Sequence, residues 1–178
     1  MQANHPSSSA GGAINNGGDQ NFDAKLLRIF GAGVNYTFGP ATLGFAYTNS
    51  YMVQPTSTEY VGSIAPATGT LSNLRFQNFE LNGKYQISPA LFVGAMYTYT
   101  RANFNTTSGK LNPTYHSVGL MADYNLSKRT DVYVQGGYQH VSGDKTGTAL
   151  DVAYVPGAAD VSSNRNQLVT RVAIRHKF

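Results

Sequence analysis

The chain has 178 residues, a formal net charge of +4 at pH 7, and neither Cys nor Trp. This length suits one domain, and the lack of Cys excludes disulfide frameworks and sites that need thiolates. The basic residues are scattered along the sequence, so no nucleic-acid partner is expected.

Charged side chains are scarce and small or aromatic ones are common. Charged residues make up 12% of the chain, about half of the usual ~25%. Tyr, Phe and Gly number 12, 9 and 19. The mean hydropathy is −0.27, and no run approaches the ~18 apolar residues of a membrane helix. This composition is typical of transmembrane β-barrels, although a soluble all-β domain would share it.

Residues 1–23 are mostly Gly, Ser, Asn and Ala and show no periodicity. Such a stretch indicates a flexible loop. It contains neither the basic nor the apolar region of a secretory signal. An exported protein would therefore carry its signal upstream of this sequence.

From residue 24 onward the apolar residues follow a period of two, which indicates strands rather than helices. Seven long stretches show this pattern: 24–38, 41–51, 76–87, 90–104, 114–126, 131–141 and 166–178. Short turns at 39–40, 88–89 and 127–130 alternate with long polar connections. Soluble sandwiches have strands nearer 5–6 residues, whereas outer-membrane barrels combine long strands with short turns at one end and long loops at the other. We therefore predict an all-β fold in which residues 24–178 form part of an antiparallel transmembrane β-barrel with short periplasmic turns and long extracellular loops.

The alternation also predicts which side chains face a lumen, since a membrane barrel turns its polar side inward and its apolar side to lipid. The predicted charged lining consists of Arg171, Arg175, Lys177, Lys84, Glu80 and Asp123. We expect Arg171 and Arg175 to attract anions together, because their fields overlap within a Debye length of ~8–10 Å. The alternative is that these charges only solvate the lumen or, for Lys177, its periplasmic rim.

Aromatic residues gather near the strand ends, where the two interfacial girdles of a membrane barrel belong. The residues assigned to these girdles are Tyr36, Phe38, Tyr85, Tyr97, Tyr99, Tyr124, Tyr133 and Phe178.

No catalytic, metal or cofactor site is predicted, and we expect no enzyme. The stretch DKTGT, which begins at Asp144, resembles the phosphorylation site of P-type ATPases, but it lacks the α/β surroundings that this chemistry needs. The four histidines lack metal-ligand spacing, and a serine–histidine–carboxylate set has no support beyond residue type.

Two internal segments and the C-terminus resemble general porins of the β-proteobacterial type. They are FELNGKYQISPAL (79–91), ADYNLSKRTDVYVQGGYQHV (122–141) and the final RHKF. The resemblance implies the C-terminal portion of a sixteen-stranded barrel in the outer membrane. It further implies a homotrimer, contact with outer-membrane lipid, and passive diffusion of ions and small hydrophilic solutes. It also implies that Phe178, on the last strand, belongs to the signal that the outer-membrane assembly machinery reads.

Two other functions stay open at the level of the sequence. The first is a small closed outer-membrane barrel that does not conduct and acts as an adhesin or anchor, since eight strands need a chain of this size. The second is a soluble β-sandwich that binds carbohydrate through Tyr, which requires the opposite assignment of the two faces.

Overall fold

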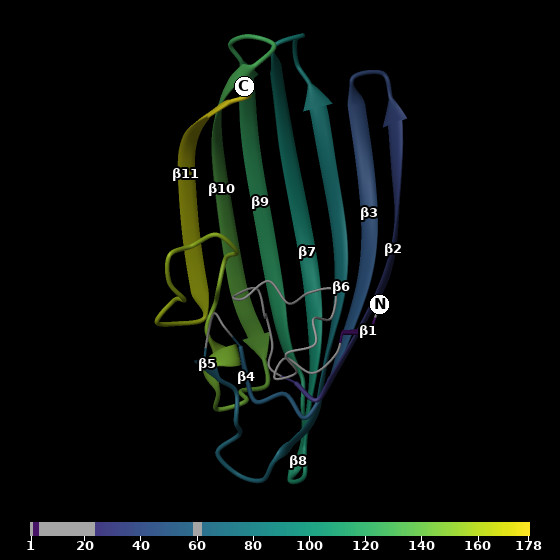
Figure 1. The fold of residues 1–178 in the computed structure, drawn as a ribbon, viewed down its shortest axis with the longest axis vertical. Helices are drawn as coiled ribbons and strands as arrows, with labels where there is room; N and C mark the ends of the chain where they lie inside the picture. The colour runs from purple at the N-terminus through teal and green to yellow at the C-terminus, as the bar shows by residue number, and fades with distance from the viewer. Residues whose placement is uncertain (1, 4–23, 59–61) are drawn as a thin grey trace.

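The computed structural model describes residues 2–3, 24–58 and 62–178. Seven long strands form one antiparallel sheet in which neighbours along the chain are also neighbours in space (Figure 1). They are β2 (Leu26–Phe38), β3 (Ala41–Val53), β6 (Leu71–Gln86), β7 (Leu91–Thr106), β9 (Pro113–Asn125), β10 (Thr130–Gly143) and β11 (Asn166–His176). The prediction of seven long strands is therefore confirmed.

Several shorter elements flank these strands. β1 (Gln2–Ala3) pairs with β2, β8 (Gly109–Leu111) pairs with β7, and β4 (Ser57–Thr58) pairs with β5 (Gly62–Ser63). A 3-10 turn, η1, covers Ala149–Asp151. Two residues of the stretch predicted to be flexible thus extend the sheet, and residues 4–23 lie outside the described residues.

The connections alternate in length as predicted. Residues 39–40, 87–90 and 126–129 are short turns at one end of the sheet, where the C-terminus also lies, and residues 54–70, 107–112 and 144–165 connect strands at the other end (Figure 1). The short turns are set by local chemistry. Gly39 has a φ of 54°, which favours glycine, and the hydroxyl of Ser127 accepts hydrogen bonds from the amides of Arg129 and Thr130 at 3.1 Å each.

Strand β6 begins at Leu71, five residues before the predicted start at residue 76. A register irregularity between Leu71 and Asn73 interrupts the alternation of apolar and polar residues there. The period of two in the sequence therefore does not reveal this part of the strand. Leu71 and Leu74 are both buried, so packing extends the strand where the sequence pattern ends.

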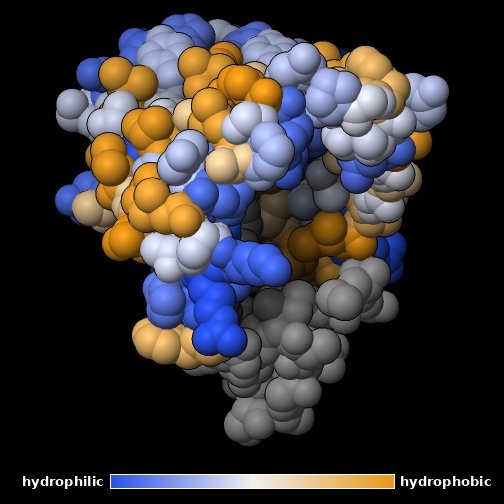
Figure 2. Space-filling view, turned by 90° about the horizontal axis from the view of Figure 1, so that it is seen from above, coloured by the Kyte–Doolittle hydropathy of each residue, from blue (hydrophilic) through white to orange (hydrophobic). Residues whose placement is uncertain are grey.

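The register divides the side chains into two faces. Outward-facing members are large, apolar and exposed over the middle of the sheet, as Val34, Phe45, Leu81, Leu120 and Val172 show. The opposite face, here called the inner face, carries the polar members, and the molecule is hollowed on one side when it is seen from the end with the short turns (Figure 2). Burying the outward side chains in lipid would remove apolar surface from water at about 25 cal/mol per Å².

The predicted girdle aromatics that lie on strands are on the outward face with one exception. Tyr133 was expected among them, and this prediction is wrong. Its register partners are Asp123 and Ala173, which places it on the inner face. The residues on either side of Tyr133, Val132 and Val134, are both apolar. A period of two in the sequence therefore does not decide whether Tyr133 or the two valines point outward.

The buried core lies on the inner face at the end of the long connections. Met52, Leu74 and Phe104, each with no exposed surface, pack with Ile64 and Leu150 from two different connections. A second cluster joins Ala102, Tyr115, Val141 and Ala153. The long connections therefore fold over the inner face instead of standing away from the sheet. No helix among the described residues is long and apolar enough to cross a membrane.

The sheet is open. Its strand order runs from β1 and β2 at one edge to β11 at the other, and no register pairs the two edges within the described part of the chain. This confirms the prediction that the long strands form part of a barrel.

Candidate pore-lining surface

The middle of the inner face is polar and is organised by side-chain amides and hydroxyls. Asn82 donates to Glu80 at 2.9 Å along β6, and Thr100 of β7 donates to Asn78 of β6 at 2.7 Å. The side chains with which these alternate, such as Leu81, are exposed on the other face. This arrangement gives one wall that suits water and one that suits lipid.

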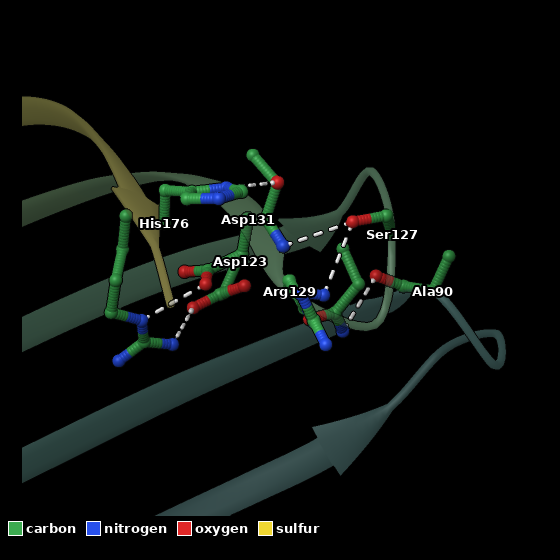
Figure 3. Close-up of polar contacts among 9 residues, drawn as sticks. Ala90, Asp123, Ser127, Arg129, Asp131 and His176 are labelled. Atoms are coloured by element: carbon green, nitrogen blue, oxygen red, sulfur yellow. Dashed lines mark hydrogen bonds and ion pairs between the residues drawn. The ribbon is translucent and has the colours of Figure 1, made fainter. Parts of the chain in front are cut away.

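A charge cluster lies near the short-turn end of the inner face (Figure 3). The Nε of Arg175 donates to Asp131 at 2.9 Å, and its Nη2 lies 3.7 Å from a carboxylate oxygen of Asp123. The side chains of Asp123 and Asp131 are 0% and 5% exposed, whereas that of Arg175 is 55% exposed. The cluster links strands β9, β10 and β11, because the three residues come from these strands in turn.

The cluster changes the expected roles of two predicted lining residues. Asp123 is on the inner face but buried, so it does not meet solvent directly. Arg175 faces two carboxylates, and its charge is compensated within the protein. Sequence reasoning missed Asp131. Its position on the polar side of its strand was visible, but only the strand register places it opposite Arg175.

Lys84 and Glu80 lie on the inner face of β6. The Nζ of Lys84 lies 4.0 Å from the centre of the Phe92 ring on β7, a cation–π distance. Glu80 accepts from Asn82, as described above, and forms no ion pair among the described residues.

Arg171 holds a segment of the β10–β11 connection against the wall. Its Nη2 donates to the carbonyl oxygen of Gly157 at 3.0 Å. The side-chain oxygen of Gln139 accepts from the amide of Tyr154 at 2.8 Å, and that of Gln167 accepts from the amide of Val155 at 2.6 Å. Three inner-face side chains thus bind the backbone of residues 154–157, here called the inner segment.

The wall is shaped to receive the inner segment. A Cβ added at Gly137 would lie 2.9 Å from Cγ1 of Val155, so a larger residue there would displace the segment. A cavity of about 450 Å³ lies between the inner segment and the wall, with Gly119, Met121 and Arg171 among its lining residues. The inner segment therefore occupies space on the side of the sheet that the sequence assigns to a lumen.

The last two residues lie beyond β11 at the short-turn end. The amide of Lys177 donates to the carbonyl of Arg129 at 2.9 Å, which keeps the terminus beside the turn between β9 and β10. Phe178 is fully exposed, and its ring centre lies 4.9 Å from that of His176 in an edge-on arrangement. His176 in turn shares a 2.8 Å hydrogen bond with the hydroxyl of Thr130 (Figure 3).

The remaining candidate motifs have structural surroundings. The carboxylate of Asp144 accepts from the amide of Asn112 at 2.8 Å, which joins two connections at the long-loop end. His116 and His140 are register partners on the outward face, where His116 shares a 2.8 Å hydrogen bond with Tyr97. In the described part of the chain, no three His, Asp or Glu side chains gather as a metal site.

Comparison with known proteins gives one family and one fold. The family model of the Gram-negative porins matches residues 3–145. Two solved structures of OmpT from Vibrio cholerae, one expressed in the outer membrane and one folded in vitro, superpose with a TM-score of 0.55 at 18% identity. Each alignment covers 85% of this chain and 41% of that chain, so this chain spans about two fifths of their length. No curated protein matches.

Proposed function

The chain belongs to the family of Gram-negative porins, and we propose that it forms part of the wall of a water-filled channel for passive diffusion of ions and small hydrophilic solutes. Its site is the bacterial outer membrane, as the family and the fold indicate. We further propose that the protein is a porin of the β-proteobacterial type and that its full-length form is a homotrimer. The outer-membrane assembly machinery would recognise its C-terminal strand.

One observation carries this proposal: the sheet separates an exposed apolar face from a polar face that holds Lys84, Glu80 and Arg171. A soluble sandwich would bury the apolar face against a second sheet. Among the described residues no such sheet covers it. The open edges also disfavour the alternative of a small closed barrel, because that barrel needs β2 to pair with β11.

The channel acts through binding and exclusion, and no chemical step is involved. Inner-face charges set which ions enter, because a narrow wet pore repels ions of like sign. Arg171 donates to a neutral carbonyl, so its positive charge is not cancelled there, whereas that of Arg175 is. We therefore expect Arg171 to favour the passage of anions more than Arg175 does.

The test is conductance of the purified full-length protein, of which this chain is a part, in planar lipid bilayers. We expect ohmic steps that scale with salt concentration. Under a salt gradient, Arg171→Gln should move the reversal potential toward that of the cation. The matched control is Arg175→Gln with Asp131→Asn, which leaves the local net charge unchanged and should move it less. Membrane-inserted, protease-protected protein without conductance would overturn the channel and favour an anchor or adhesin.

A further inference from the structure

Three arginines lie on the outward face near the long-loop end. Arg28 of β2 and Arg75 of β6 are both register partners of Tyr51 on β3, and Arg101 of β7 pairs with Gln77. All three are exposed. Alternation confirms their orientation, because the neighbouring Leu74 and Ala102 are buried on the inner face. We call Arg28, Arg75 and Arg101 the arginine collar.

The arginine collar borders a row of aromatic rings. The ring centres of Phe30 and Tyr47 are 6.3 Å apart, those of Tyr47 and Phe79 are 5.0 Å apart, and those of Phe79 and Tyr99 are 6.4 Å apart. His116 continues the row at 5.3 Å from Tyr99. On the short-turn side of this row the outward face is apolar, with exposed side chains such as Phe45, Leu81 and Leu120, and on the long-loop side it carries the collar. Aromatic rows of this kind lie at the level of lipid headgroups.

The collar has no acidic partner in the described part of the chain. Both ion pairs there belong to Arg175. The described Asp and Glu side chains on long strands are on the inner face, and the others lie in the β10–β11 connection: Glu80, Asp123, Asp131, Asp144, Asp151 and Asp160. The guanidinium of Arg75 lies 5.2 Å from the ring centre of Tyr51, a contact that leaves its charge uncompensated.

We propose that the arginine collar binds the phosphate groups of anionic lipid in the outer leaflet, with the acyl chains lying along the apolar part of the outward face. Guanidinium groups bind phosphate through charge-assisted hydrogen bonds. Basic clusters at headgroup level are a general basis for recognition of anionic lipid. The proposal uses the outer-membrane placement of the chain and does not depend on conduction.

Charge complementarity favours lipid over a second copy of the chain as the occupant. A neighbouring copy would present the outward face of its own strands, which carries no carboxylate among the described residues. Three uncompensated arginines facing such a surface would be desolvated without an ionic partner, and this is unfavourable. Lipid phosphate supplies the missing charge at the required level.

The test measures lipid preference directly. The whole chain is reconstituted in phosphatidylcholine nanodiscs with a small fraction of fluorescent phosphatidic acid. Since the chain contains no Cys, the variant Thr114→Cys places a single energy-transfer label on the outward face of β9, next to Arg101 in the register. Fluorescent phosphatidylcholine provides the reference. Each arginine near an anionic surface raises the binding affinity roughly five-fold.

We expect phosphatidic acid to be enriched near the label, and the variant Arg28→Gln, Arg75→Gln, Arg101→Gln to reduce the enrichment by about ten-fold or more. The corresponding Lys variant should retain most of it, which separates lost charge from misfolding. The control Lys84→Gln, Lys128→Gln, Arg171→Gln removes equal charge from the inner face and from the short turn between β9 and β10, and should retain the enrichment as well. Equal loss in this control would overturn the proposal, because net charge alone would then explain the enrichment.

Two further results would also overturn it. Displacement by millimolar inorganic phosphate without any dependence on lipid would indicate a site for free phosphate. Loss of self-association in pure phosphatidylcholine on replacing the collar would indicate an interface between copies. Absence of conductance would leave the collar proposal unaffected, so its failure and that of the channel proposal are distinguishable.

Discussion

Replacing Arg175 with Gln should destabilise the sheet at its last strand. The variant removes a charge-assisted hydrogen bond of 2.9 Å to Asp131, a bond worth roughly 1.5–3 kcal/mol. It also removes the attraction to Asp123 at 3.7 Å, about 4.5 kcal/mol at an effective dielectric constant of ~20 before desolvation is counted. Because the Arg175 side chain is 55% exposed, much of this attraction is screened. We expect the free energy of unfolding to fall by about 2–4 kcal/mol. Removing one partner of a fully buried ion pair costs about 3–5 kcal/mol, so the expected loss is somewhat smaller.

The assay is urea unfolding of the chain in detergent micelles or lipid vesicles, followed by Tyr fluorescence and circular dichroism. Arg171→Gln is the matched control. It loses one bond to a neutral carbonyl and should cost about 1 kcal/mol. In the background of Asp123→Asn and Asp131→Asn, Arg175→Gln should cost much less, because no buried charge is then left unpaired. Unchanged stability of Arg175→Gln in the wild-type background, or equal losses for the two arginine variants, would refute the reasoning.

Three other predictions follow from single contacts. Phe178→Ala should lower the amount of protein assembled in the outer membrane, seen as heat-modifiable bands on gels, by more than Val172→Ala does. Burial alone would cost only a few kcal/mol at either site, so equal losses would remove a signalling role from Phe178. Gln139→Ala with Gln167→Ala should release the inner segment and raise single-channel conductance, and unchanged conductance would show that this segment does not narrow the path. Phe104→Ala, fully buried, should lower the free energy of unfolding by about 3–5 kcal/mol, measured by urea titration, and a loss below ~1 kcal/mol would contradict its packing role.

The alternating pattern was sufficient to predict the long strands and the polarity of their faces. In β11, Val172 and Ile174 against Arg171 and Arg175 fix the two faces by sequence position alone, because side chains alternate with a period of two. The short turns at 39–40 and 127–130 follow from residues whose preferences are local. The sequence also predicted only part of a barrel, since seven long strands do not complete the sixteen-stranded barrel that the resemblance implies.

Contacts between residues distant in the sequence were decided only by the tertiary structure. Asp131 forms a hydrogen bond with Arg175, which lies 44 positions later in the sequence. Ile64 and Leu150 belong to the same buried cluster on the inner face. The inner segment is held by Gln139 and Gln167, ordinary polar residues whose role depends on where a long connection folds. Local propensity and period do not encode the path of a connection or the register that places one strand opposite another, because both are set by the packing of the whole sheet.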